Sequence, residues 1–126
     1  MNMKPYIFIV DDDSLVRQPL EKDFNENFSN SYLIESFLSG VEAFDAFQKL
    51  QNGSRLKLVL TDLDMPEMNG LELTKKLREE GYKDHIILQT AHHHEYSGRE
   101  EEIGVSAVVR KDYGIILEKA KELLQL

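Results

Sequence analysis

The sequence contains no cysteine, which excludes a disulfide framework and any thiolate acting as nucleophile or metal ligand. It lacks an apolar stretch near the roughly 20 residues that a membrane span needs. Its first residues show no basic segment followed by an apolar run, so no secretion signal is visible. These absences predict a cytoplasmic protein.

Linkers and repeats are missing too, because no Pro/Ser-rich segment, composition shift or internal repeat divides the 126 residues. Residues 1–126 are therefore predicted to form a single domain. By size scaling, such a domain buries about two thirds of the surface that its unfolded chain exposes, enough for a core. The composition, 41% hydrophobic and 30% charged, is that of a globular protein and argues against disorder.

Basic residues are in the minority, with 15 Lys and Arg against 23 Asp and Glu and a net charge of −8. A negatively charged surface repels the phosphate backbones of nucleic acids. Direct nucleic-acid binding is therefore not expected, because it depends on basic patches and released counterions.

Apolar runs alternate with amphipathic segments along the whole chain. Strands are predicted at residues 6–10, 32–38, 56–61, 86–90 and 106–109. Helices are predicted from a cap at Ser14, from a capping box at residues 39–42, over 70–80, between 93 and 103, and from about 113. Pro19 is expected to distort the first helix, and Gly98 to weaken the fourth.

Five strands alternating with five helices imply an α/β fold, a parallel sheet covered on both faces. By fold-level analogy this favours a doubly wound, flavodoxin-like sheet with strand order 2-1-3-4-5. The polar pair Glu35-Ser36 indicates that the second strand lies at an edge.

Reactive side chains follow four of the strands at their carboxyl ends, where ligands bind in such sheets. They are Asp11, Asp12 and Asp13 after the first strand, Asp62 after the third, Thr90 after the fourth, and Arg110 and Lys111 after the fifth. Carboxylates, a hydroxyl and an ammonium group suit a hard cation such as Mg²⁺ together with a phosphate. A carboxylate can itself be the nucleophile and form an acyl phosphate.

These residues resemble the response-regulator receiver family across essentially the whole chain. Asp11-Asp12 is similar to the acidic pair of that family, and residues 62–70 (Asp-Leu-Asp-Met-Pro-Glu-Met-Asn-Gly) to its D-x-x-M-P-x-M-x-G phosphoacceptor segment. Thr90-Ala91 is similar to its hydroxyl residue and small neighbour, and Lys111, seven residues after Gly104, to its lysine. Each match alone is weak, but four in order, each at a strand end, form a strong signal.

The resemblance implies a phosphoacceptor signalling switch of a two-component phosphorelay. Because no linker or composition shift divides the chain, no output domain is expected within it. Asp62 would take a phosphoryl group from a phosphohistidine on a sensor histidine kinase or histidine phosphotransfer protein. The protein would catalyse this transfer and the later hydrolysis of its own phosphoaspartate, without multiple-turnover activity. Thr90 and Lys111 would contact the phosphoryl oxygens.

The same resemblance implies Mg²⁺ as cofactor. Asp12 and Asp62 would ligate the ion directly, Asp11 largely through water, and Asp64 through its main-chain carbonyl. A downstream protein would meet the face formed by the fourth helix, fifth strand and fifth helix, which includes parts of residues 100–103, Val108 and Tyr113.

The chain departs from the family pattern at two positions. Asp112 follows the lysine where the family usually has proline, often after a cis peptide. Because a cis bond before a non-proline residue costs about 2.5–4 kcal/mol, the Lys111–Asp112 peptide is predicted to be trans. Val108 replaces the switch aromatic three residues before the lysine, so an aromatic side-chain flip cannot operate.

Two other functions compete with the receiver. Asp62 and Asp64 have the D-x-D spacing of haloacid-dehalogenase-type phosphatases. In such an enzyme Asp62 would be the nucleophile and Asp64 the general acid/base. The motif falls in the middle of a chain that is short for that fold, and the upstream aspartates would go unexplained. The other alternative is an unphosphorylated pseudo-receiver that acts only as a binding module, which the complete Asp/Thr/Lys set disfavours.

Two local patterns have simpler interpretations. Residues 11–13 could merely be acids favoured at a helix N-terminus, although their combination with Asp62 and Lys111 argues otherwise. His92-His93-His94 suggests a metal site, but consecutive side chains point in different directions and favour a solvated loop. His92, two residues after Thr90, also holds a position that in the receiver family influences phosphoryl-group lifetime.

Overall fold

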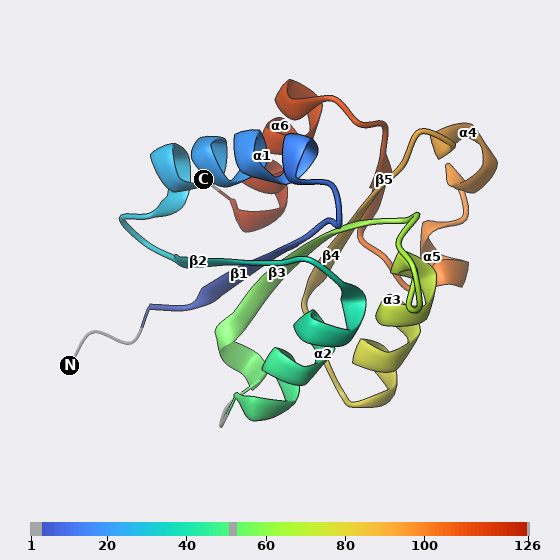
Figure 1. Ribbon diagram of the computed structural model, residues 1–126, viewed down its shortest axis with the longest axis horizontal. Helices are drawn as coiled ribbons and strands as arrows, with labels where there is room; N and C mark the ends of the chain where they lie inside the picture. Colours follow the sequence, from blue (N-terminus) through green and yellow to red (C-terminus); the bar gives the residue numbers. More distant parts are fainter. Residues whose placement is uncertain (1–3, 51–52, 126) are drawn as a thin grey trace.

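A parallel sheet of five strands in the order β2-β1-β3-β4-β5 forms the centre of the protein (Figure 1). The computed structural model describes residues 4–50 and 53–125. The strands are β1 (Tyr6–Val10), β2 (Leu33–Phe37), β3 (Leu56–Asp62), β4 (His85–Gln89) and β5 (Ala107–Val109). All four strand pairings are parallel. The predicted flavodoxin-like order is therefore confirmed.

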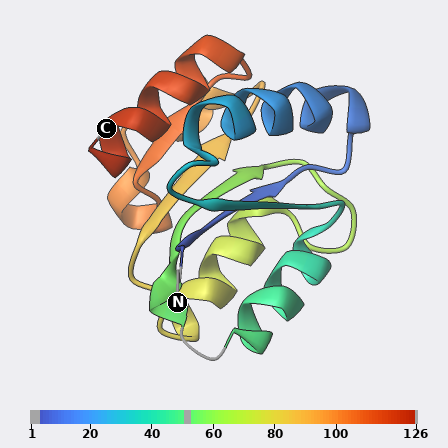
Figure 2. The same ribbon diagram turned by 90° about the vertical axis from the view of Figure 1, so that its left-hand side faces the viewer.

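Helices cover both faces of the sheet, with α1 and α6 on one face and α2 and α3 on the other (Figures 1 and 2). Their bounds are α1 (Ser14–Phe28), α2 (Gly40–Lys49), α3 (Gly70–Glu79), α4 (His93–Tyr96), α5 (Glu100–Ile103) and α6 (Tyr113–Leu124). A 3-10 turn, η1 (Gly53–Arg55), precedes β3. In the described part of the chain, no helix is long and apolar enough to cross a membrane.

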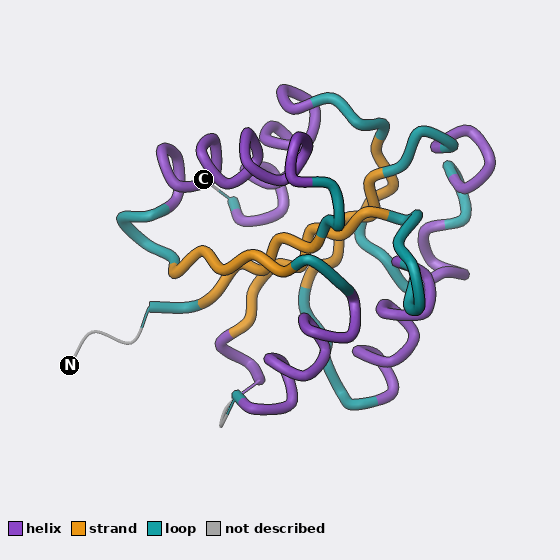
Figure 3. Tube along the Cα trace, in the orientation of Figure 1, coloured by secondary structure: helices purple, strands orange, loops and turns teal. Residues whose placement is uncertain are grey.

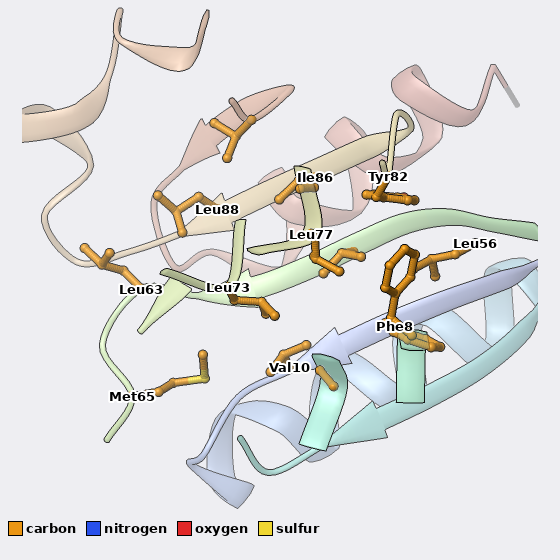
Figure 4. Close-up of a cluster of buried hydrophobic side chains, with 14 residues drawn as sticks. Phe8, Val10, Leu56, Leu63, Met65, Leu73, Leu77, Tyr82, Ile86 and Leu88 are labelled. Carbon is orange, nitrogen blue, oxygen red and sulfur yellow. The ribbon is translucent and has the colours of Figure 1, made fainter. Parts of the chain in front are cut away.

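The alternation of side chains along the strands divides the core into two layers. Under α1 and α6 lie Ile7, Ile9, Leu58, Leu60 and Ile87, packed against Leu20, Phe24, Phe28, Ile116 and Ala120. Under α2 and α3 lie Phe8, Val10, Val59, Ile86 and Leu88, packed against Ala43, Phe47, Leu73 and Leu77 (Figure 4). Burial on both faces explains the continuous apolar runs of β1, β3 and β4.

Strand β2 pairs only with β1 and lies at an edge of the sheet, as predicted. Glu35 and Ser36 are exposed there. These polar side chains indicate an edge position, because burying them in a strand covered on both faces would be costly without hydrogen-bond partners.

The helix count differs slightly from the five predicted, since residues 4–50 and 53–125 form six α-helices and the short turn η1. The difference lies between residues 93 and 103, where one predicted helix is two four-residue helices, α4 and α5. Ser97 is extended (ψ 132°) and Gly98 has φ +89°. A left-handed residue cannot continue an α-helix, and glycine adopts that conformation without steric cost.

The predicted cap at Ser14 is wrong, because Asp13 caps α1. Its carboxylate oxygen Oδ1 accepts a hydrogen bond of 2.9 Å from the Leu15 N–H, and Ser14 is the first helical residue. The Asp13 carboxylate is also negatively charged and interacts more favourably with the positive end of the helix dipole than the Ser14 hydroxyl would.

Helix α1 runs without interruption through Pro19. Proline has no N–H, so the carbonyl of Leu15, four residues earlier, has no helical donor. The Tyr113 hydroxyl at the start of α6 donates a long hydrogen bond of 3.4 Å to this oxygen. The two helices on this face are therefore linked at their N-terminal ends.

Candidate functional site

The carboxyl ends of β1, β3 and β4 meet at one edge of the sheet, where the loops in Figure 3 leave the strands. Val10 pairs with Thr61, and Asp62 with Gln89. Carboxylate oxygens of Asp11, Asp12 and Asp62 consequently lie within 4.8 Å of one another. Two of these carboxylates, those of Asp11 and Asp62, belong to buried residues, whereas Asp12 is exposed.

Asp11 is held by two hydrogen bonds, one to each carboxylate oxygen. The Asp13 main-chain N–H donates to Oδ1 at 2.9 Å, and the Gln89 side-chain amide donates to Oδ2 at 3.0 Å. Burial raises the pKa of Asp11 to about 6, and repulsion by Asp62 and Asp12 acts in the same direction. The charged form of this group is therefore costly in the absence of a cation.

Asp62 pairs with the predicted lysine, because Lys111 Nζ lies 2.9 Å from its Oδ1. Burial raises the pKa of Asp62 above its ordinary value even though the Lys111 ammonium acts in the opposite direction. Partial burial tends to lower the pKa of Lys111, but its hydrogen bond and attraction to Asp62 outweigh burial and raise it. Lys111 thus stays cationic beside a buried carboxylate.

The loop that follows Asp62 is anchored by its apolar side chains. Leu63 and Met65 are buried and point into the same core layer as Val10 and Leu88 (Figure 4). The side chain of Asp64, between them, is exposed. Met65, which follows Asp64, therefore fixes the loop onto the core.

Helix α3 starts directly against the main chain of Asp62. The Gly70 N–H donates to the Leu63 carbonyl at 2.8 Å, and a Cβ at Gly70 would lie only 2.4 Å from the Asp62 carbonyl oxygen. Asn69 caps the helix, and its side chain and that of Glu72 form a reciprocal capping box. Only glycine permits this approach of the helix to the strand end.

Thr90 lies at the end of β4, fully buried, and its hydroxyl accepts a 2.9 Å hydrogen bond from the His92 N–H. Its own N–H donates to the Val109 carbonyl at 3.0 Å, which ties it to β5. No peptide bond of the described residues is cis, so the predicted trans geometry at Lys111–Asp112 is confirmed. Asp112 instead caps α6 through a hydrogen bond from the Ile115 N–H.

Val108 and Tyr113 lie where the sequence indicates, on β5 and at the start of α6. Val108 is half-buried and pairs with Leu88 in the sheet. Tyr113 is 40% exposed and contacts α1 through the Leu15 carbonyl, so its side chain is engaged away from β5.

The histidine tract lies at the start of α4, beyond Thr90. His92 and His94 are exposed, and the rings of His93 and His94 are 3.9 Å apart between centroids. Burial of the ring, repulsion by His94 and repulsion by Arg110 lower the pKa of His93.

The acidic cluster is the one group of three or more His, Cys, Asp or Glu ligand atoms that converges within residues 4–50 and 53–125. Its donors are all carboxylate oxygens, which suit Mg²⁺ rather than a softer metal. The raised pKa values of Asp11 and Asp62 fit the same interpretation, because burial, together with repulsion by neighbouring carboxylates, disfavours their charged forms, and a bound cation would stabilise those forms.

Gln89 contributes to the site but was not predicted from the sequence. The sequence places it within the strand predicted at residues 86–90 and indicates no role for its side chain. The available signal was its polarity, since an amide ends a run of three apolar residues directly before Thr90.

A sequence profile of the response regulator receiver domain matches residues 7–120. The chain is 37% identical to a chemotaxis protein CheY homolog of Campylobacter jejuni over 83 aligned residues. This alignment covers 65% of this chain and 60% of that protein. Over 85 residues the chain is 36% identical to response regulator MprA of a Mycobacterium species, covering 68% of this chain and 34% of that protein. The chain thus spans less than two thirds of the length of these relatives.

Solved structures with the same fold include the receiver domain of Francisella response regulator 1452, with TM-score 0.82 and 20% identity over 97% of this chain and 98% of that chain. Response regulator TrrA from Thermotoga maritima, in complex with Mg²⁺-BeF, has TM-score 0.77 and 30% identity over 96% of this chain and 99% of that chain.

Proposed function

The chain belongs to the response regulator receiver family, and we propose that it is a phosphorylation switch in which Asp62 accepts the phosphoryl group. One observation carries the proposal. The buried Asp62 carboxylate lies 2.9 Å from a lysine ammonium and within 4.8 Å of two further carboxylates at one sheet edge. A carboxylate nucleophile, an ammonium group for the phosphoryl oxygens and a set of oxygen ligands for a metal ion are thereby assembled from three separate segments.

In the proposed reaction an Asp62 carboxylate oxygen attacks the phosphorus of a phosphohistidine. A P–O bond forms while the P–N bond breaks, and the departing imidazole takes up a proton. Lys111, already beside Asp62, pairs with the negatively charged phosphoryl oxygens as the phosphoryl group moves onto Asp62. The buried Thr90 hydroxyl is proposed to contact the same oxygens.

The carboxylate cluster fits Mg²⁺, and Asp12 and Asp62 would hold the ion directly, with Asp11 acting largely through water and Asp64 through its main-chain carbonyl. When bound, Mg²⁺ supplies charge neutralisation for the carboxylates and the incoming phosphoryl group. The exposed Asp12 can change its ligation without disturbing the core, whereas Asp11 and Asp62 are fixed by their burial. The complex of TrrA with Mg²⁺-BeF supports this assignment.

The donor is proposed to be a sensor histidine kinase or a histidine phosphotransfer protein, as the similarity to CheY homologues supports. The downstream partner is proposed to bind the face of α4, α5, β5 and the start of α6. Thr90 directly follows Gln89, the strand partner of Asp62, and it is bonded to this face, because its N–H donates to the Val109 carbonyl of β5 and its hydroxyl accepts from the His92 N–H before α4.

Single-turnover labelling separates this function from a phosphatase that uses Asp62 and Asp64. Incubation with acetyl phosphate and Mg²⁺ should add one hydroxylamine-labile phosphoryl group per chain, and Asp62→Asn should accept none. Continuous release of phosphate from small phosphate esters, abolished by Asp64→Asn, would instead identify a phosphatase. The exposed Asp64 side chain, outside the carboxylate cluster, favours the first outcome.

A further inference from the structure

Gln89 is a buried amide at the end of an otherwise apolar strand. The three residues before it, Ile86, Ile87 and Leu88, are buried core residues, and Gln89 itself has no exposed surface. Burying an amide is costly unless its nitrogen and oxygen both find partners. Its presence at this position therefore needs a specific partner.

The amide nitrogen has such a partner, because Nε2 donates to Asp11 Oδ2 at 3.0 Å. Nitrogen rather than oxygen must face an ionised carboxylate, which can only accept hydrogen bonds. The contact reaches from β4 to the residue after β1, across the intervening strand β3. With the Asp13 N–H on Oδ1, it fixes both oxygens of Asp11.

The amide oxygen differs from the nitrogen, because within residues 4–50 and 53–125 no group donates to the buried Oε1 of Gln89. This oxygen belongs to the same planar amide as Nε2, so it lies close to the acidic cluster. The neighbouring carboxylates offer no N–H or O–H when ionised, and a water molecule is the donor that such a site can hold.

We propose that Gln89 is a positioning residue of the cation site: its nitrogen holds the Asp11 carboxylate, and its oxygen accepts a hydrogen bond from a water molecule bound to the cation. The inference rests on the proposed function, because it assigns Mg²⁺ to the carboxylate cluster. It accounts for both halves of the amide, one already bonded and one buried without a donor. Outer-sphere partners of this kind orient ligands and raise metal affinity.

A purely structural role would make Gln89 no more than a partner for a buried carboxylate. Its removal would then lower stability without a specific effect on Mg²⁺ affinity. Tyr82 provides a control, since its residue is buried and its hydroxyl donates a partly buried hydrogen bond of 3.0 Å to the His85 carbonyl at the opposite end of β4. Tyr82→Phe removes this hydrogen bond far from the carboxylates.

The test measures the Mg²⁺ dissociation constant by isothermal titration calorimetry for the parent chain, Gln89→Met, Tyr82→Phe and Asp12→Asn. Gln89→Met is expected to bind Mg²⁺ about tenfold more weakly than the parent, and Tyr82→Phe to match the parent. Asp12→Asn, which removes a direct ligand, should bind more weakly still. A Gln89→Met constant equal to that of the parent, while Asp12→Asn is impaired, would overturn this inference and leave the proposed function standing. A parent chain that binds no Mg²⁺ would overturn both.

A second measurement needs no variant and covers the case in which Gln89→Met does not fold. The side-chain NH₂ resonances of Gln89 in the parent chain should shift on Mg²⁺ addition, with the same midpoint as the calorimetric titration. Unchanged Gln89 resonances at saturating Mg²⁺, with changes elsewhere in the cluster, would overturn the inference.

Discussion

Asp12 is the exposed member of a carboxylate cluster whose other members are buried. Like charges about 4 Å apart repel by about 4 kcal/mol at an effective dielectric constant near 20, and hydration of Asp12 relieves much of this. Asp12→Asn removes one charge with little change of shape. It should raise the free energy of unfolding in chelator by about 1 kcal/mol, as measured by urea denaturation.

The same variant should respond differently to the cation. Millimolar Mg²⁺ should raise the melting temperature of the parent chain, because the ion binds the native state alone, and Asp12→Asn should lose most of that gain. If Asp12→Asn were destabilising and the parent indifferent to Mg²⁺, the three carboxylates would not form a cation site.

Asp11 predicts a pH dependence of stability with a definite sign. Its pKa is about 6 in the folded chain and 3.8 ordinarily, so between these values the native state binds more protons than the unfolded state. The metal-free parent should therefore lose stability as pH rises from about 4 to about 6, on the order of 2 kcal/mol relative to Asp11→Asn. Urea denaturation of both proteins in chelator at several pH values measures the difference between their free energies of unfolding. If the pKa of Asp11 were ordinary, this difference would not change between about pH 4 and about pH 6.

At the scale of single elements, the junction between β3 and α3 sets the geometry around Asp62. A Cβ at Gly70 would clash with the Asp62 main-chain oxygen, which cannot move aside as a flexible side chain could. Gly70→Ala should therefore lower the free energy of unfolding by about 1–3 kcal/mol and slow the labelling of Asp62. Gly114→Ala is the control, because its Cβ meets only the Asp112 carboxylate, at 3.4 Å, and alanine favours the helix. Equal stability of the two variants would contradict the close packing at Gly70.

The short helices α4 and α5 are the elements most open to rearrangement. Each has four residues, neither has a side-chain N-cap, and Gly98 separates them. With Val108 in place of an aromatic residue, phosphorylation is expected to remodel residues 91–103 without an aromatic flip. Amide hydrogen exchange with and without beryllofluoride and Mg²⁺ should show altered protection in this segment. Identical protection in both states would contradict the expectation.

The main elements could be predicted from the sequence because their apolar patterns are strong. The bounds of β1 agree with the prediction, β3 extends one residue further, and β4 lies one residue earlier at both ends, since buried runs are bounded by polar residues. The break at Gly98 could not be predicted with certainty, because a glycine within a helical pattern can also be tolerated. Asp13 and Ser14 are both good caps, and only the backbone geometry decides between them.

At the scale of the whole molecule, the parallel topology gathers residues that are far apart in the chain. Strand order alone predicts that Asp11, Asp62 and Lys111 meet, since all of them follow strands that end at the same edge. Gln89 could not be predicted in the same way, because its role depends on a side chain that crosses one strand to reach Asp11. The sequence shows that such a residue is polar, but it does not show in which direction the side chain points.

The proposed function requires that, among the many acidic residues of this fold, Asp62 is the phosphoacceptor. Borohydride reduction converts a phosphoaspartate to homoserine, so treatment after incubation with acetyl phosphate and Mg²⁺ marks the modified position for peptide mass spectrometry. We expect homoserine at position 62 alone, absent when Mg²⁺ is chelated and absent from Asp62→Asn. Homoserine at position 64 or at position 12, or undiminished labelling of Asp62→Asn, would contradict the proposed function.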